Sequence, residues 1–191
     1  VECWQEKRPI QKVGLYIPGG TAPLFSSVLM LAIPAKIAGC KEIMLATPPN
    51  KKGKINPAII YAAQQCGVTK IIKVGGIQAI AAMTFGTETI PQVYKIFGPG
   101  NQFVTVAKQL STKYGVAIDM PAGPSELLVV ADASANASFV ASDLLSQAEH
   151  GTDSQVILVS TSKSKLEEVE KEIDKQIQVL TRKSIAEKAI G

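Results

Sequence analysis

The chain has 191 residues, 46% of them hydrophobic, and a formal net charge of +4 at pH 7. This composition is sufficient for one substantial hydrophobic core or two small ones, so a globular fold is expected. The basic residues are mostly scattered rather than gathered with aromatic residues on one stripe, which argues against nucleic acid as a partner.

The sequence indicates neither a membrane segment nor a disulfide framework. The longest apolar stretch, residues 24–38, includes a proline and a lysine and falls short of the roughly 20 apolar residues that a spanning helix needs. No hydrophobic signal core is visible near the N-terminus. Cys3, Cys40 and Cys66 are an odd number without ligand-like spacing. We therefore expect no membrane association and a cytoplasmic location.

In the first two thirds of the chain, short β-branched runs alternate with longer segments of helical periodicity. The predicted strands are residues 13–17, 42–46, 70–74, 93–97 and 116–120. The predicted helices are residues 24–39, 57–66, 77–85 and 101–113. This alternation predicts right-handed crossovers and a Rossmann-like parallel sheet with helices on both faces. Ligands of such sheets bind outside the carboxyl ends of the strands.

Prolines and a glycine at 121–124 interrupt the alternation, and a second α/β series follows. Its predicted elements are residues 127–131, 137–149, 155–160, 163–180 and 183–190. We therefore predict a Rossmann-like domain over residues 1–122, followed by part of a second α/β domain over residues 123–191. Two strands alone would leave unpaired sheet edges, so we expect the natural protein to continue.

Three glycine-bearing turns follow predicted strands, at residues 18–23, 75–78 and 98–101. None matches the GxGxxG fingerprint, and each could be a purely structural turn. Together they would converge on one edge where backbone can approach a nucleotide closely. Tyr16, just before the first turn, could stack on a planar ring or simply cap the sheet. Gln78 and Asn101 could offer amide hydrogen bonds, although Asn101 is also well placed to cap a helix.

A predicted helix near residue 150 carries the most informative polar residues. Gln147 and His150, the only histidine of the chain, are three positions apart and could share one ion or ligand. Two donors cannot complete a tetrahedral zinc site, and a lone histidine near a helix end also interacts favourably with the helix dipole. Ser125 could bind a substrate or cap its own turn. The order of residues does not support a Ser-His-Asp hydrolase.

Five motifs, taken in order and spacing, resemble histidinol dehydrogenase. They are Gly14–Leu24, Lys73–Ala82, Ile96–Asn101, Ala117–Glu126 and Phe139–Gly151. The resemblance is specific from residue 1 to about residue 160 and looser beyond it. It implies an aldehyde-dehydrogenase-like architecture and the last step of histidine biosynthesis, the NAD-dependent oxidation of L-histidinol through histidinal to L-histidine.

The resemblance also implies roles for particular residues. Tyr16, Gln78 and Asn101 would contact NAD, whereas Ser125, Gln147 and His150 would contact histidinol. Gln147 and His150 would in addition bind zinc, which in this family holds the substrate in position.

Other parts of the family pattern are expected outside the chain. The catalytic Glu-His pair and the Asp and His that complete the zinc shell would lie beyond residue 191, so no catalytic residue is assigned here. The family also has an N-terminal region before this segment, and its members form intertwined homodimers. We therefore expect the 191-residue chain to be inactive alone.

Three alternatives remain open at this stage. The chain could be a nucleotide-binding or interaction module without catalysis. It could retain the fold but lose affinity for NAD. It could also be an aldehyde-dehydrogenase-like enzyme with a cysteine nucleophile, but Cys40 and Cys66 are expected at helix ends on the side away from the glycine-rich turns.

Overall fold

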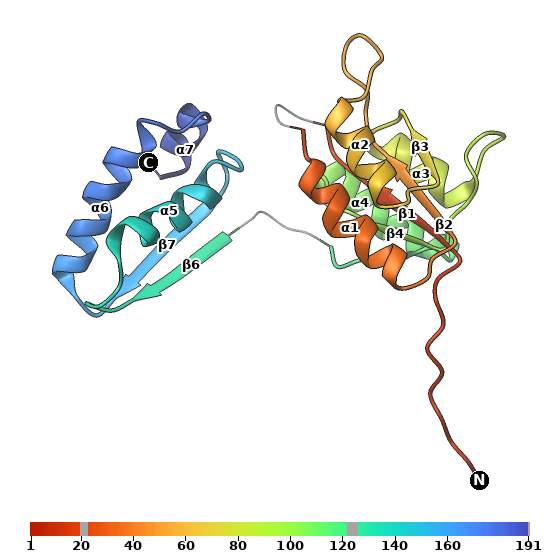
Figure 1. The fold of residues 1–191 in the computed structure, drawn as a ribbon, viewed down its shortest axis with the longest axis horizontal. Coiled ribbons are helices and arrows are strands. Elements are labelled where there is room, and N and C mark those ends of the chain that lie inside the picture. Colours follow the sequence, from red (N-terminus) through yellow and green to blue (C-terminus); the bar gives the residue numbers. More distant parts are fainter. Residues whose placement is uncertain (20–22, 122–125, 191) are drawn as a thin grey trace. The chain divides into compact units, whose positions relative to one another are not determined.

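The structure, a computed structural model, describes residues 1–19, 23–121 and 126–190. The chain divides into two compact units, Val1–Ala122 and Gly123–Gly191. Each unit is an α/β structure built around a parallel sheet (Figure 1). The predicted α/β class with a parallel Rossmann-like sheet is therefore confirmed.

The first unit contains a five-stranded sheet of order β3-β2-β1-β4-β5, in which every neighbouring pair is parallel. Its strands are β1 (Lys12–Tyr16), β2 (Glu42–Ala46), β3 (Lys70–Ile72), β4 (Lys95–Phe97) and β5 (Ala117–Ile118). The chain runs outward from β1 to β3 and then returns to place β4 on the other side of β1. The strand order thus reverses between β1 and β4, which is where doubly wound sheets bind their ligands.

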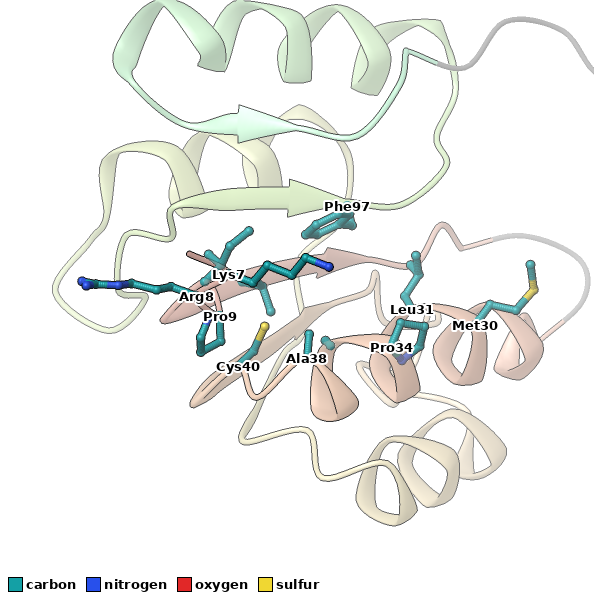
Figure 2. Close-up of a pocket in the computed structure, with 12 residues that line it drawn as sticks. Lys7, Arg8, Pro9, Met30, Leu31, Pro34, Ala38, Cys40 and Phe97 are labelled. Carbon is teal, nitrogen blue, oxygen red and sulfur yellow. The ribbon is translucent and has the colours of Figure 1, made fainter. Parts of the chain in front are cut away.

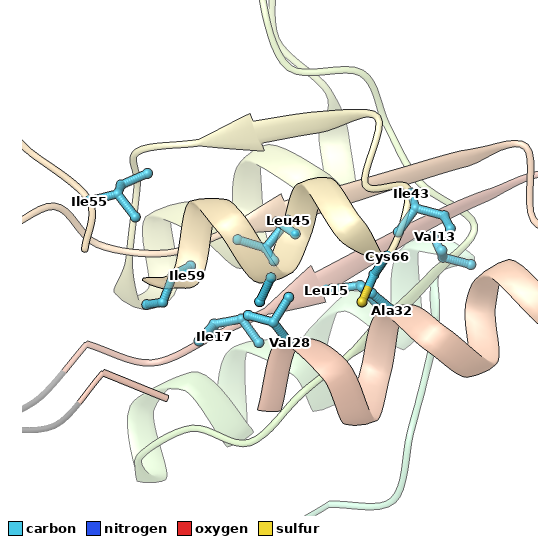
Figure 3. Packing of buried hydrophobic residues seen from close by; sticks show 12 residues of the cluster. Val13, Leu15, Ile17, Val28, Ala32, Ile43, Leu45, Ile55, Ile59 and Cys66 are labelled. Carbon is cyan, nitrogen blue, oxygen red and sulfur yellow. The ribbon is translucent and has the colours of Figure 1, made fainter. Parts of the chain in front are cut away.

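Two pairs of helices cover the two faces of this sheet. The helices are α1 (Phe25–Ile37), α2 (Pro57–Gln65), α3 (Gly76–Phe85) and α4 (Gln102–Ser111), the last followed by a 3-10 turn, η1 (Thr112–Tyr114). Val28 of α1 and Ile59 of α2 pack with Leu15 and Leu45 on one face, as Figure 3 shows. On the other face, Met83 of α3 and Val104 of α4 pack against the sheet.

The predicted strands and helices are present, and several are shorter than predicted. Val93 was predicted to begin β4, but its N–H bonds to the Met83 carbonyl oxygen at 2.9 Å instead of a neighbouring strand. The helix predicted to end at Gly39 ends at Ile37. Gly39 has a φ of 83° and donates to the Lys36 carbonyl, and Cys40 donates to that of Ala35. These backbone bonds terminate the helix and lead the chain into β2.

The second unit contains the two-stranded parallel sheet β6 (Glu126–Ala131) and β7 (Gln155–Ser160). Its helices are α5 (Ala137–Ala148), α6 (Lys163–Ile177) and α7 (Lys183–Ile190). Leu127, Val129, Val156 and Leu158 point towards the cluster formed with α5 and α6.

The opposite face of this small sheet is apolar and exposed. Leu128 pairs in register with Ile157, and Val130 pairs with Val159. All four of these side chains are exposed. Burial alternates along β6 and β7, but the side chains on both faces of these strands are apolar. A continuously apolar strand is typical of a parallel sheet that is covered on both faces.

No helix in the part of the chain that the structure describes is both long enough and apolar enough to cross a membrane.

Candidate functional site at the carboxyl edge of the first sheet

The loops that follow β1, β2 and β3 meet around Pro48. A Cβ atom added at Gly75 would lie 2.5 Å from the Pro48 Cβ, and one added at Gly19 would overlap the Pro48 ring. Only glycine allows this close packing, because any side chain at either position would displace the proline ring. The predicted convergence of the glycine-bearing turns is therefore seen for the described parts of the first two turns.

Tyr16 connects two of these loops. Its side chain is buried, and its hydroxyl oxygen accepts a 3.0 Å hydrogen bond from the Gly76 N–H at the start of α3. Of the two uses considered for Tyr16, the structure displays the packing one. The residue holds the start of α3, and with it Gln78, against the end of β1.

The turn after β4 is held by a largely buried ion pair. The Gly98 N–H donates to Oδ2 of Asp119 at 2.7 Å, and Nζ of Lys108 donates to the Gly98 carbonyl oxygen at 2.6 Å. Lys108 also forms an ion pair with Oδ1 of Asp119, and its side chain is only 5% exposed. Both polar groups of the Gly98 backbone are thus bound by one Lys-Asp pair, drawn from α4 and from the residue after β5.

Gly98 also lies against β1. Its φ is 126°, and a Cβ atom added there would clash with the carbonyl oxygen of Tyr16. This close approach joins the turn after β4 to the end of β1, at the point where the strand order reverses.

Asn101 and Gln78 lie at the first turns of the two helices on the same face of the sheet. The Oδ1 atom of Asn101 accepts the Val104 N–H at 3.1 Å and so caps α4. The side-chain NH2 group of Asn101 is therefore the part that could donate to a ligand. Gln78 is exposed in the first turn of α3. The N-termini of α3 and α4 therefore lie at the carboxyl edge of the sheet. The positive end of each helix dipole is at that terminus, where an anionic group of a ligand would be stabilised.

Gln147 and His150 lie in the second unit. Gln147 is in the last turn of α5, and its buried Nε2 atom has no hydrogen-bond partner among the described residues. His150 is exposed and lies beyond Ala148, the last residue of α5, in a turn where its N–H donates to the Gln147 carbonyl at 3.1 Å. His150 thus lies three residues after Gln147, just past the end of α5. Ser125 lies outside the described residues.

A buried amide without a partner normally acquires one from a ligand, an ion or water. The unsatisfied atom is the NH2 nitrogen, which donates hydrogen bonds and does not bind metal ions, so Gln147 fits the binding of a hydrogen-bond acceptor better than a core role. In the described ranges no group of three or more His, Cys, Asp or Glu side chains is placed to hold a metal ion. Gln147 and His150 can accordingly supply only part of a zinc shell.

The cavities of the first unit differ in their relation to this edge. One of about 590 Å³ lies beside the ends of β1 and β2 and is lined by Pro18, Thr47, Asn50 and Lys54, among others. Another, of about 650 Å³, lies between α1 and Phe97 of β4 and is mostly apolar, with Lys7 and Arg8 at its rim (Figure 2). Neither of these two is lined by Tyr16, Gln78 or Asn101, but a third cavity of about 370 Å³, between α3 and α4, is lined in part by Gln78.

The cysteines are not arranged for nucleophilic catalysis. Cys66 caps the C-terminus of α2 and is buried in the core, and Cys40 follows the C-terminus of α1. Both therefore lie at the ends of helices that lead into the next strand, as predicted, away from the carboxyl edge of the sheet.

The sequence motifs did not single out Lys108 or Asp119. Lys108 follows the buried Val104 by four positions and precedes the buried Ser111 by three, so it lies on the apolar stripe of α4. Because lysine is almost never buried without a charged partner, a lysine in the apolar stripe indicates that a carboxylate lies beside it. Asp119 lies within the motif Ala117–Glu126, but nothing in that motif indicates that its carboxylate pairs with Lys108.

This arrangement defines the class of the first unit: a doubly wound α/β domain whose tightest backbone contacts are at the switch point of its sheet. The histidinol dehydrogenase family model matches residues 1–191. The chain belongs to the histidinol dehydrogenase family.

Individual relatives agree with this assignment. A histidinol dehydrogenase from Bacteroides fragilis is 68% identical over the whole chain, which covers 45% of that protein. The crystal structure of histidinol dehydrogenase from Elizabethkingia anophelis is 63% identical, with a TM-score of 0.93, over 96% of this chain and 42% of that one. The chain thus spans less than half the length of these relatives.

A more distant structure shares the fold alone. It is a propionaldehyde dehydrogenase from Rhodopseudomonas palustris, crystallised with propionyl-CoA, at 14% identity and a TM-score of 0.55. The match covers 88% of this chain. It agrees with the expected aldehyde-dehydrogenase-like architecture.

Proposed function

We propose that the complete enzyme carrying this chain oxidises L-histidinol to L-histidine through histidinal, with NAD as the oxidant. The observation that carries the proposal is the family match over all 191 residues, together with 68% identity to a histidinol dehydrogenase. Oxidation of an alcohol to a carboxylic acid needs two hydride transfers, and NAD, when bound, accepts the hydride in each.

In this proposal the first unit holds the cofactor. Tyr16 ends β1, Gln78 lies in the first turn of α3, and Asn101 caps the N-terminus of α4. Gln78 and the side-chain NH2 group of Asn101 would donate hydrogen bonds to polar atoms of NAD. Tyr16 is buried, so it would hold the start of α3 in place through its bond to Gly76 and would contact NAD only through the edge of its ring.

The second unit would hold the substrate. Gln147, through its carbonyl oxygen, and His150 would each supply one zinc ligand, and Ser125 would contact histidinol. Bound zinc would hold the amino and imidazole nitrogens of the substrate and so fix the position of the carbon to be oxidised. The remaining ligands would come from other residues of the complete enzyme.

The residues of this chain bind and orient, and none is assigned the proton transfer. The resemblance gives that task to a Glu-His pair, and His150 is the only histidine here. We accordingly propose that the isolated chain does not turn over histidinol, and that the complete enzyme is a cytoplasmic homodimer.

The cofactor assignment is tested by steady-state kinetics on the complete enzyme. Asn101→Ala and Gln78→Ala should each raise KM for NAD, whereas Gln102→Ala, an exposed neighbour of Asn101, should leave it unchanged. Loss of one hydrogen bond of about 1 kcal/mol corresponds to roughly a fivefold rise in KM. Unchanged KM in both variants would remove these residues from the cofactor site.

The zinc assignment is tested by metal analysis. Replacing Gln147 and His150 together by alanine should abolish stoichiometric zinc binding in the complete enzyme. Gln155→Ala, at an exposed position at the start of β7, should leave the zinc content unchanged. Normal zinc content in the double variant would refute the assignment. A complete enzyme that forms no NADH from histidinol would instead favour a nucleotide-binding or interaction module.

A further inference from the structure

The Lys108–Asp119 ion pair binds the backbone of Gly98, in the turn between β4 and α4. Asp119 accepts the Gly98 N–H at 2.7 Å, and Lys108 donates to the Gly98 carbonyl at 2.6 Å. One ion pair thus fixes the peptide groups on both sides of a single glycine. Resting on the proposed NAD site, we propose that Lys108 and Asp119 are positioning residues that preorganise the β4–α4 turn for the cofactor.

Burial is the first reason to assign them this role. The side chain of Lys108 is 5% exposed and that of Asp119 is 27% exposed. Withdrawing two charges from water is unfavourable, and apolar residues of similar size would often stabilise a core as well or better. The pair is therefore poorly explained by stability alone, whereas its two bonds to Gly98 specify one conformation of the turn.

The location of Gly98 is the second reason. The glycine lies against the Tyr16 carbonyl oxygen, and Asn101 begins the helix three residues later. Tyr16 in turn binds the start of α3 through the Gly76 N–H. A shift of the Gly98 turn would consequently displace Asn101 directly and would loosen the contact with Tyr16.

The action is indirect, because neither charged group is assigned a contact with the cofactor. A preformed turn spares the cofactor the cost of ordering it, so the pair should act on cofactor affinity and not on the chemical step. The effect should appear in KM for NAD, with kcat and KM for histidinol largely retained.

The main experiment compares Lys108→Met with Lys12→Met in the complete enzyme. Lys12 forms an ion pair with Glu42 at 3.3 Å in the same sheet, but at the amino ends of β1 and β2. Lys108→Met should raise KM for NAD about tenfold, the scale of a modest coupling free energy, and change kcat less than about twofold. Lys12→Met should change neither. An unchanged KM for NAD in folded Lys108→Met would overturn the proposal, as would equal losses in kcat and in the KM values for both substrates.

A second measurement needs no variant to fold and no catalysis. In the complete enzyme without NAD, hydrogen exchange at the Gly98 amide should already be slow, because Asp119 accepts its hydrogen bond. Fast exchange that slows only when NAD is added would mean that the cofactor orders the turn, and would overturn the proposal. Slow exchange in a complete enzyme that makes no NADH would leave the positioning of the turn intact and place the failure in the proposed function.

Discussion

Tyr16 and Gly98 are in close backbone contact at the carboxyl ends of the neighbouring strands β1 and β4. A Cβ atom at Gly98 would clash with the Tyr16 carbonyl oxygen, which cannot move without disturbing β1. Gly98→Ala should therefore be severely destabilising, by about 3 kcal/mol or more, because the clash adds to the strain of a positive φ.

Gly115→Ala is the matched control for this prediction. Gly115 has a φ of 81° but nothing within 4 Å of an added Cβ, so its substitution should cost only the backbone strain, about 1 kcal/mol. Denaturant unfolding of the two variants measures the difference. Equal losses of stability would contradict the steric explanation.

The core under α1 and α2 gives a second prediction. Ile43 is 2% exposed in that cluster (Figure 3), whereas Ile37 at the end of α1 is 81% exposed. Ile43→Ala should reduce the free energy of unfolding by about 2–5 kcal/mol, and Ile37→Ala should change it by no more than about 0.5 kcal/mol. Denaturant unfolding measures both values, and a large effect of Ile37→Ala would indicate that its side chain is covered in the folded chain.

The exposed sheet face of the second unit gives a third prediction. Val130 is 74% exposed and points away from α5 and α6, whereas the neighbouring Val129 packs towards them. In the 191-residue chain, Val130→Thr should lower the binding of a hydrophobic dye without loss of stability. Val129→Thr should destabilise the unit by about 1 kcal/mol, because its hydroxyl would be partly buried against α5 and α6. Similar melting temperatures for the two variants would contradict this orientation of β6.

The fourth prediction concerns Asp132, in the loop after β6. A hydrogen bond from the Ser134 hydroxyl, followed by one from the Ser134 N–H, lowers the pKa of the Asp132 carboxyl below its ordinary value. The folded-state pKa is the lower one, so the stability contributed by the charged carboxylate is present above the unfolded pKa. It is lost as the pH falls through the folded pKa.

Ser134→Ala should raise the pKa of Asp132 part of the way to its ordinary value, because the backbone N–H bond remains. Ser134→Thr, which keeps the hydroxyl, should restore the low pKa. Carbon NMR titration of the carboxyl measures both, and an unchanged pKa in Ser134→Ala would show that the hydroxyl bond is not the main cause.

The alternation of strands and helices was predictable because each strand is short, β-branched and followed by a glycine or polar turn. The ends were harder to predict, as Val93 shows: its side chain is buried like that of a strand residue, but its N–H is bonded to a helix. Hydrophobicity reports burial and does not report the hydrogen-bond partner.

The candidate site was predictable to a smaller extent. The glycines of its turns are visible in the sequence, and so is Asn101 as a helix cap. The link from the Tyr16 hydroxyl to Gly76 joins residues far apart in the chain, and local periodicity carries no information about it. The Lys108–Asp119 pair was missed for the same reason, although a lysine in the apolar stripe of α4 could have drawn attention to it.

The position of β1 between β2 and β4 has a consequence for how the chain folds. β2 follows β1 after one helix, whereas Leu15 finds its other register partner, Phe97, only after two more strands and two more helices have been passed. Closing that long loop costs entropy before any contact compensates it, so the β1–β4 pairing should form late and slowly. The Gly98 turn depends on that pairing, and it would therefore be among the last parts of the first unit to reach its native geometry.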